Sequence, residues 1–310
     1  MARYIGRRLI VLVPVVWLVF TLVFSILHIL PGDPVQLMLA GAEAGVSSPE
    51  RMAQLRKSMG LDQPLYIQYG GFILHAVRGD LGESIRFQSP VNRLVLTAAS
   101  QTLQLSVAGL AAALTIGLPL GIIAALNENR WIDTTATLIA LLGVSMPLFW
   151  LGQLLILGVA IHLRWLPAIS GEQLRGIVLP AFTLGFVSAG LISRLMRASL
   201  AEVLHSDYIR TALAKGLRKR AIVMRHAIKN ALIPVVTVVG LQFGGMLSGA
   251  VVTETVFSRP GLGSLVVKGI LWHDYPLIQG TVLFIAISYV LVNLLVDLAY
   301  ARLDPRIDYT

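Results

Sequence analysis

The residue types that carry out enzymatic chemistry are sparse and scattered in this chain of 310 residues. There is no cysteine, which excludes disulfides, thiol nucleophiles and cysteine-based metal sites. No glycine is followed by lysine, so the phosphate-binding pattern Gly-x-x-x-x-Gly-Lys-Ser/Thr is missing, and so is His-Glu-x-x-His. We therefore expect no catalytic residues and no metal site. Energy for any work must come from another chain or from an ion gradient.

Uncharged polar side chains are the next candidates, because several interrupt long apolar runs: Gln101, Gln104, Gln153, Gln242 and Ser248. Taken singly, each is expected to form hydrogen bonds between helices. The alternative is that these side chains line a hydrated pathway through which a polar solute crosses. Gln242 and Ser248 are the best pathway candidates, because glycines between Gly240 and Gly249 allow close helix approach or a local break.

The spacing of charged residues predicts the helices that position these polar groups. Six intervals contain no Asp, Glu, Lys or Arg, and the shortest has 18 residues: 9–32, 94–127, 134–163, 176–193, 230–253 and 275–296. Eighteen helical residues reach about 27 Å, close to the thickness of a bilayer's hydrocarbon core. Each interval can cross a membrane once. We expect an all-α membrane protein with six transmembrane helices, the first retained rather than cleaved.

The positions of the basic residues set the predicted orientation. With the N-terminus inside, the segments 1–8, 127–133, 194–230 and 297–310 carry 15 of the 25 Lys and Arg residues. Outside, the long segment 33–93 carries six basic and six acidic residues, and the remaining outer loops carry four basic residues. The positive-inside rule therefore places both termini in the cytoplasm.

We interpret the outer segment 33–93 as a small insertion. Ser48 and Pro49 open a helix that Gly60 ends, and Leu65–Val77 forms a second helix. We expect one membrane domain spanning 1–310, with this insertion and a cytoplasmic loop at about 194–230.

The cytoplasmic loop 194–230 is the most informative stretch, with nine basic residues. Ser206 and Asp207 offer an N-cap, good helix formers follow, and Gly216 suits a left-handed C-cap. Ile209, Leu213 and Leu217 form an apolar stripe. Two short helices meeting at a glycine would suit docking into a groove on another protein. The alternative is a solvated basic loop that only fixes topology.

The segment Tyr208–Gly216, with the sequence YIRTALAKG, resembles the EAA loop of binding-protein-dependent ABC importer permeases of the dipeptide, oligopeptide and nickel subfamily. Other segments resemble the same subfamily in order along the chain: Leu30–Pro34, Gly60–Leu65, Arg78–Gly82, Arg225–Pro234, Pro260–Gly263, Asp274–Pro276 and Leu303–Arg306. Two residues depart from the family's pattern. Arg210 stands where the general pattern has Glu, and Leu213 where the subfamily often has Arg.

The resemblance implies a type I importer permease fold in the bacterial inner membrane. It also implies a second homologous permease, two ATPase subunits that bind ATP and Mg²⁺, and a solute-binding protein outside. No cofactor belongs to this chain, which is not itself an enzyme. The implied ATPase-coupling residues are Tyr208, Ile209, Arg210, Thr211, Ala212, Leu213, Lys215, Gly216 and Leu217.

The cargo is expected to be di- or oligopeptides, with nickel, a metal chelate or glutathione as the alternative. An ion-gradient carrier is the rival class. It is disfavoured because such carriers place ionisable groups near the bilayer centre, whereas His28, His162, Glu254 and Asp297 lie at span ends.

Two further residues could act on the pathway. Pro147 is expected to kink the third span, either statically or as part of a gate. Glu254 precedes Pro260 and its neighbouring glycines at the outer end of the fifth span. It is an outer-gate or binding-protein candidate, or else an anchor for the loop.

Overall fold

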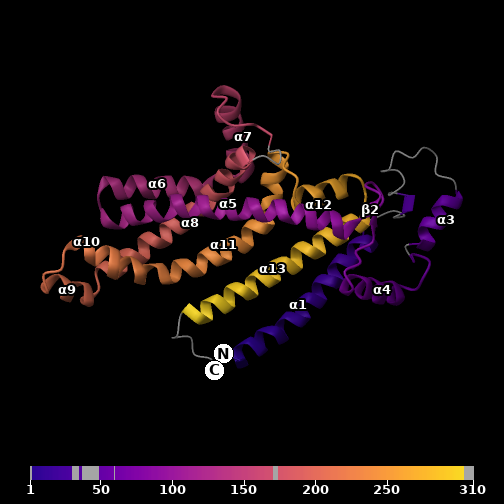
Figure 1. Cartoon of the computed structure of the whole chain (residues 1–310), viewed down its shortest axis with the longest axis horizontal. Helices are drawn as coiled ribbons and strands as arrows, with labels where there is room; N and C mark the ends of the chain where they lie inside the picture. Colours follow the sequence, from indigo (N-terminus) through magenta and orange to yellow (C-terminus); the bar gives the residue numbers. More distant parts are fainter. Residues whose placement is uncertain (1, 30–34, 37–48, 59, 170–173, 304–310) are drawn as a thin grey trace. The chain divides into compact units, whose positions relative to one another are not determined.

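The computed structural model describes residues 2–29, 35–36, 49–58, 60–169 and 174–303. This part of the chain is mostly helical and contains one short β-hairpin, whose strands have two residues each (Figure 1). Its α-helices are α1 (Ala2–Ile29), α3 (Pro49–Ser58), α4 (Leu65–Val77), α5 (Val91–Leu126), α6 (Trp131–Ser145), α7 (Leu148–Leu155), α8 (Val178–Leu204), α9 (Asp207–Ala214), α10 (Lys219–Ile222), α11 (Ile228–Val256), α12 (Leu262–Leu271) and α13 (Tyr275–Leu303). Strands β1 (Glu83–Ser84) and β2 (Ser89–Pro90) pair antiparallel, η1 (Ile156–His162) and η3 (Val223–Ala227) are π-helical, and η2 (Leu174–Ile177) is a 3₁₀ turn.

The chain divides into two compact units. The first comprises residues 1–102 and 260–291, and the second comprises residues 103–259 and 292–310. The expectation of a single membrane domain is not tested by this division and stays a prediction.

In the first unit, α4 begins and ends where the sequence predicts, and α3 begins at Pro49 as expected. The residue between α3 and Gly60, and the predicted cap Ser48, lie outside the described residues. Phe72 of α4 packs edge-on against Phe20 of α1 at 5.9 Å between ring centroids. The hydroxyls of Thr21 and Tyr69 are hydrogen-bonded at 2.7 Å. The insertion therefore folds onto the first helix through aromatic contacts.

A second set of contacts in this unit fixes the hairpin to the turn between α12 and α13. The buried Asp274 carboxylate accepts hydrogen bonds from the Ser84 hydroxyl and, at 3.1 Å, from the Arg86 N–H. The Thr102 hydroxyl accepts a hydrogen bond from the Leu262 N–H at 2.8 Å, at the start of α12. These bonds satisfy backbone groups that a loop would otherwise leave unpaired.

The second unit is built around α8. In the most apolar 18-residue stretch of this helix, 67% of the residues are buried. Its neighbours approach closely because small residues line the contacts. A Cβ added at Gly121 of α5 would lie 2.5 Å from the Ser193 carbonyl oxygen of α8. Gly190 of α8 similarly faces the backbone of α6 at Ala140. Helices α5, α6 and α11 thus pack against α8. Buried side chains of α5, α8 and α11 form one core.

The described residues contain four helices long and apolar enough to cross a membrane, in the ranges 91–126, 175–204, 219–247 and 275–296. A fifth candidate is the broken pair formed by α6 with α7 and η1. Helix α1 has 28 residues, although its described apolar stretch covers only Ile10–Ser25. The count of six spans therefore stays a prediction.

The third expected span differs from its predicted form. We predicted one kinked helix over 134–163, but α6 ends at Ser145 and α7 begins at Leu148, with 105° between the two helices. Pro147 supplies no N–H and disfavours helical backbone at Met146, which is extended with φ −80° and ψ 128°. The proline therefore breaks the helix, and α7 turns away from α6 (Figure 1).

Candidate functional site

The predicted docking helix is α9, which lies with α10 at one end of α8 and α11 (Figure 1). Ser206 precedes it in an extended conformation, but the Ser206 hydroxyl donates to the Val203 carbonyl and does not cap α9. Asp207 lies in the first turn, where a carboxylate favours the positive end of the helix dipole. The predicted N-cap position is thus correct, while its side-chain hydrogen bond is different.

The C-terminal end of α9 is a complete Schellman motif. Gly216 has φ +76°, its N–H donates to the Leu213 carbonyl at 2.9 Å, and the Leu217 N–H donates to the Ala212 carbonyl at 3.3 Å. The left-handed conformation at Gly216 is the one that glycine adopts without steric cost. A Cβ added at this position would meet no atom within 4 Å. The predicted glycine elbow is confirmed.

The apolar stripe of α9 does not point in one direction, which corrects our expectation. Ile209 is only 3% exposed and packs in the core of its own unit, whereas Leu213 and Leu217 are 49% and 44% exposed. Ala212 is half-buried against the same core as Ile209. The sequence stripe therefore combines an inward anchor, made by Ile209 and Ala212, with an outward apolar surface.

The outward surface also carries polar and charged groups. Tyr208, Arg210, Thr211, Lys215 and Gly216 are exposed beside the two leucines. The guanidinium of Arg210 lies 3.6 Å from the Asp207 carboxylate, and because both side chains are exposed this pair adds little stability. Exposed leucines among cations on a rigid short helix are suited to contact another protein.

Polar contacts tie the elbow to the helices that would move with it. The Asn230 side-chain amide at the start of α11 donates to the Tyr208 hydroxyl of α9 at 2.9 Å. The His205 ring, at the end of α8, lies 3.6 Å from the Glu128 carboxylate in the α5–α6 turn. The π-helical turn η3 then joins α10 to α11 with almost no interruption. These contacts join α9 to α11 and the end of α8 to the α5–α6 turn.

Sequence reasoning missed one functional candidate, the ion pair between Asp133 of α6 and Arg197 of α8. Two guanidinium N–H groups bind the two carboxylate oxygens at 2.5 and 2.7 Å, and the Asn129 N–H donates to the same carboxylate at 3.1 Å. Asp133 is 7% exposed and Arg197 33%. A bidentate pair of this kind fixes both distance and orientation. The sequence signal that could have indicated this pair is that both residues lie close to the predicted cytoplasmic ends of charge-free intervals, 134–163 and 176–193.

The proposed pathway residues occupy different surroundings. Gln242 is half-buried in α11, and Pro147 forms the break before α7. The side chain of Ser248 lies outside the described residues. Helix α7, which follows Pro147, packs against α11, which carries Gln242. The role of these residues in transport stays a prediction.

Glu254 is fully buried near the end of α11, so in this structure it offers no surface to a binding protein. The Arg259 N–H donates to the Glu254 carbonyl at 2.8 Å, and the Arg259 side chain is 2% exposed. Burial lowers the pKa of Arg259, and the Glu254 carboxylate opposes that shift. This arrangement favours the alternative in which Glu254 anchors the outer loop.

Comparison with known families decides the class of the protein. Residues 117–309 match the family described as the inner membrane component of binding-protein-dependent transport systems. Residues 1–101 match the N-terminal region of the same kind of membrane component. The chain belongs to this permease family.

Individual relatives cover the whole permease. The glutathione transport system permease protein GsiC of Escherichia coli O6:H1 is 43% identical over 309 residues, covering 100% of both chains. The proteins of the same name from Escherichia coli K12 and Salmonella typhi are 42% and 41% identical over the same length.

Solved structures confirm the fold. An inward-facing structure of the MetNI methionine ABC transporter matches with a TM-score of 0.58 at 18% identity, covering 68% of this chain and 96% of that chain. A crystal structure of an amino acid ABC transporter matches with a TM-score of 0.53 at 16% identity, covering 68% and 94%. The permease is thus an all-α, multi-pass inner-membrane protein with the type I importer fold.

Proposed function

We propose that this ABC importer permease carries glutathione into the cell. The observation that carries the proposal is 43% identity to a glutathione permease along the full length of both chains. The sequence analysis placed di- and oligopeptides first, and the relatives favour its alternative. Glutathione is itself a small peptide with one unusual γ-linkage, so ordinary di- and oligopeptides remain the second candidate.

The transport cycle we propose depends on α9. In this scheme separate ATPase chains bind ATP and Mg²⁺, and the exposed face around Leu213 and Leu217 fits a groove on one of them. Closure of the ATPase pair draws the elbows of two permeases together and opens the pathway outward. A solute-binding protein then delivers the cargo, and hydrolysis resets the inward-open state.

Three features of the second unit support this scheme. The glycine elbow lies between the two exposed leucines, Leu213 and Leu217. The Tyr208–Asn230 bond joins the elbow to α11. The Asp133–Arg197 pair joins α6 to α8, which leads directly into α9. This chain therefore supplies pathway walls and a lever, and bond cleavage belongs to the partner chains.

Uptake measurements test the cargo directly. The assembled transporter is reconstituted in proteoliposomes with its binding protein, ATP inside, and radiolabelled glutathione outside. We expect ATP-dependent uptake that unlabelled glutathione suppresses more strongly than dialanine or nickel does. ATP-dependent uptake of dialanine without uptake of glutathione would replace the proposed cargo by α-linked peptides.

A further inference from the structure

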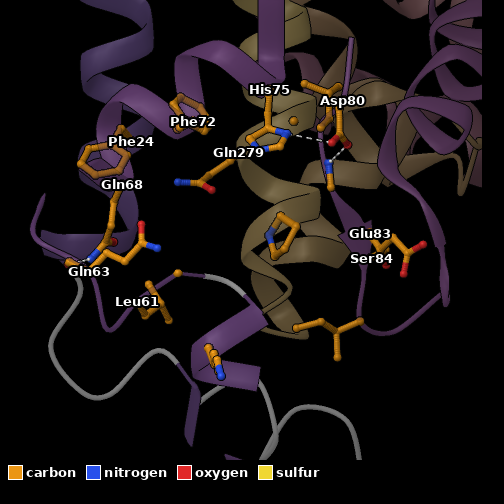
Figure 2. A pocket seen from close by; sticks show the side chains of 18 of the residues that line it. Phe24, Leu61, Gln63, Gln68, Phe72, His75, Asp80, Glu83, Ser84 and Gln279 are labelled. Carbon is orange, nitrogen blue, oxygen red and sulfur yellow. Dashed lines mark hydrogen bonds and ion pairs between the residues drawn. The ribbon is translucent and has the colours of Figure 1, made fainter. Parts of the chain in front are cut away.

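The first unit contains a cavity that no part of the proposed transport cycle uses. Its volume is about 790 Å³, and it is lined by α4, the Gly60–Gln63 turn, the β1–β2 hairpin and the first turns of α13 (Figure 2). Pockets that bind small ligands have volumes of roughly 300–1,000 Å³. The predicted topology places this cavity on the extracytoplasmic side, where cargo arrives.

One wall of the cavity presents a carboxylate that is already held in place. Asp80 accepts hydrogen bonds from the Gly82 N–H and from the His75 ring, both at 3.0 Å. The Gly82 N–H, followed by His75, lowers the pKa of Asp80 below its usual value, so this group stays negatively charged. Gly82 holds φ +80° beside Pro276 of α13. The turn that carries Asp80 therefore has a defined position.

Carboxamides also line the cavity, at Gln63, Gln68, Gln88 and Gln279. The Gln68 side-chain amide donates to the Gln63 carbonyl at 2.7 Å, and the Gln279 amide donates to the Val23 carbonyl at 3.3 Å. Figure 2 shows Gln63 and Gln68 on one side of the opening, Asp80 and Glu83 on the other, and Gln279 between them. A carboxamide both donates and accepts hydrogen bonds, as a peptide group does.

The charges and apolar groups of the lining complete the pattern. Lys57, Asp80 and Glu83 are its formally charged residues, so cationic and anionic groups can both be paired. Glu83 is exposed at the rim, and Phe24 and Phe72 provide an apolar surface. A ligand with an ammonium group, a carboxylate and internal amides matches this lining better than a metal ion or a hydrocarbon.

We propose that this cavity binds the amino-terminal end of the transported peptide, with its ammonium group against Asp80 and Glu83 and its amides against the glutamines. This inference rests on the proposed function, because it assumes that the cargo is glutathione or another small peptide. The cavity would hold the cargo on the permease between its release from the binding protein and its entry into the pathway.

The test uses the assembled transporter in nanodiscs without its binding protein. Calorimetric titration with glutathione is compared with titration with N-acetyl-glutathione, in which the ammonium is lost. We expect the acetylated probe to bind about tenfold more weakly, as loss of one charge-assisted hydrogen bond predicts. Glu83→Gln should weaken glutathione binding by a similar factor and reduce the difference between the probes, because only the Asp80 carboxylate is then left to face the ammonium. Asp62→Asn is the matched control, because Asp62 is an exposed carboxylate of the same segment outside the lining.

Several outcomes would overturn the proposal. These are no binding to the wild-type transporter, equal binding of the two probes, or an unchanged affinity in Glu83→Gln. A variant that loses affinity for the binding protein but not for glutathione would show instead that the cavity docks that protein. If uptake shows dialanine as cargo, the same comparison is made with dialanine and its N-acetyl form. The cavity and the identity of the cargo are thus tested separately.

Discussion

Substitution of Gly216 separates the shape of the elbow from its contact with a partner. A side chain at φ +76° costs about 1–2 kcal/mol for most L-residues, but much less for asparagine, because its short polar side chain can form local hydrogen bonds. A Cβ there meets no atom within 4 Å, so we expect this chain to accommodate a larger side chain as well as a methyl group. Gly216→Ala and Gly216→Trp should therefore destabilise the isolated permease equally, whereas Gly216→Asn should be nearly neutral.

The same series should behave differently in the assembled transporter. If an ATPase groove encloses the elbow, the indole of Gly216→Trp must fit a packed contact, and overpacking costs about 1–3 kcal/mol. That range corresponds to roughly 5–150-fold in the equilibrium for docking. We expect Gly216→Trp to lose uptake and binding-protein-stimulated ATP hydrolysis well beyond the loss in Gly216→Ala, while inserting normally into the membrane.

The assays are glutathione uptake in proteoliposomes, stimulated ATPase activity, and co-purification of the ATPase with each variant. Thermal unfolding of the isolated permease supplies the control for stability. Equal transport by the Ala and Trp variants would refute the reasoning, because it would show that no partner surrounds the elbow. Loss of folding in the Trp variant alone would also refute it, because the side chain would then clash within this chain.

Three further predictions concern the anchors of the elbow and the broken helix. Ile209→Ala should destabilise the permease by about 2–5 kcal/mol because its side chain is buried, whereas Leu213→Ala should leave thermal unfolding unchanged and weaken co-purification of the ATPase. Asp133→Asn should lower stability by about 1–3 kcal/mol, less than a fully buried pair because Arg197 is 33% exposed, and should reduce stimulated ATPase activity. Pro147→Ala should reduce the 105° bend, lengthening the distance between spin labels placed on α6 and α7.

Opposite results would identify the faulty step in each argument. If Leu213→Ala destabilised the permease as much as Ile209→Ala, the assignment of inward and outward faces on α9 would be wrong. Full stability and activity of Asp133→Asn would show that the ion pair does not join α6 to α8 functionally. An unchanged spin-label distance in Pro147→Ala would mean that packing around α7, rather than the proline, causes the bend.

The local features of this protein were predictable because their causes are local. A charge-free run of 18 or more residues favours an apolar helix, although the run 134–163 is broken at Pro147, and a glycine after a short run of helix formers predicts a left-handed cap. Helix α4 and the Gly216 elbow accordingly appear at the expected residues. The resemblance of ordered segments along the whole chain identified the permease family without any structural information.

The direction of a side chain was not predictable in the same way. Ile209 and Leu213 have similar hydrophobicity and helical spacing, yet one is buried and the other exposed. The difference arises because only the face of α9 that carries Ile209 meets the core of the second unit. Periodicity identifies an apolar stripe, but the neighbouring helices decide which part of it remains for a partner.

Long-range polar contacts also required the tertiary structure. The sequence by itself determined the membrane class, the family, the helix boundaries near strong local signals and the glycine elbow. Only the tertiary structure paired Asp133 with Arg197 across 64 positions, buried Glu254 and formed a cavity beside Asp80. Conformation at a cap or a span is set by neighbouring residues in the chain, whereas these features depend on which distant segments pack together.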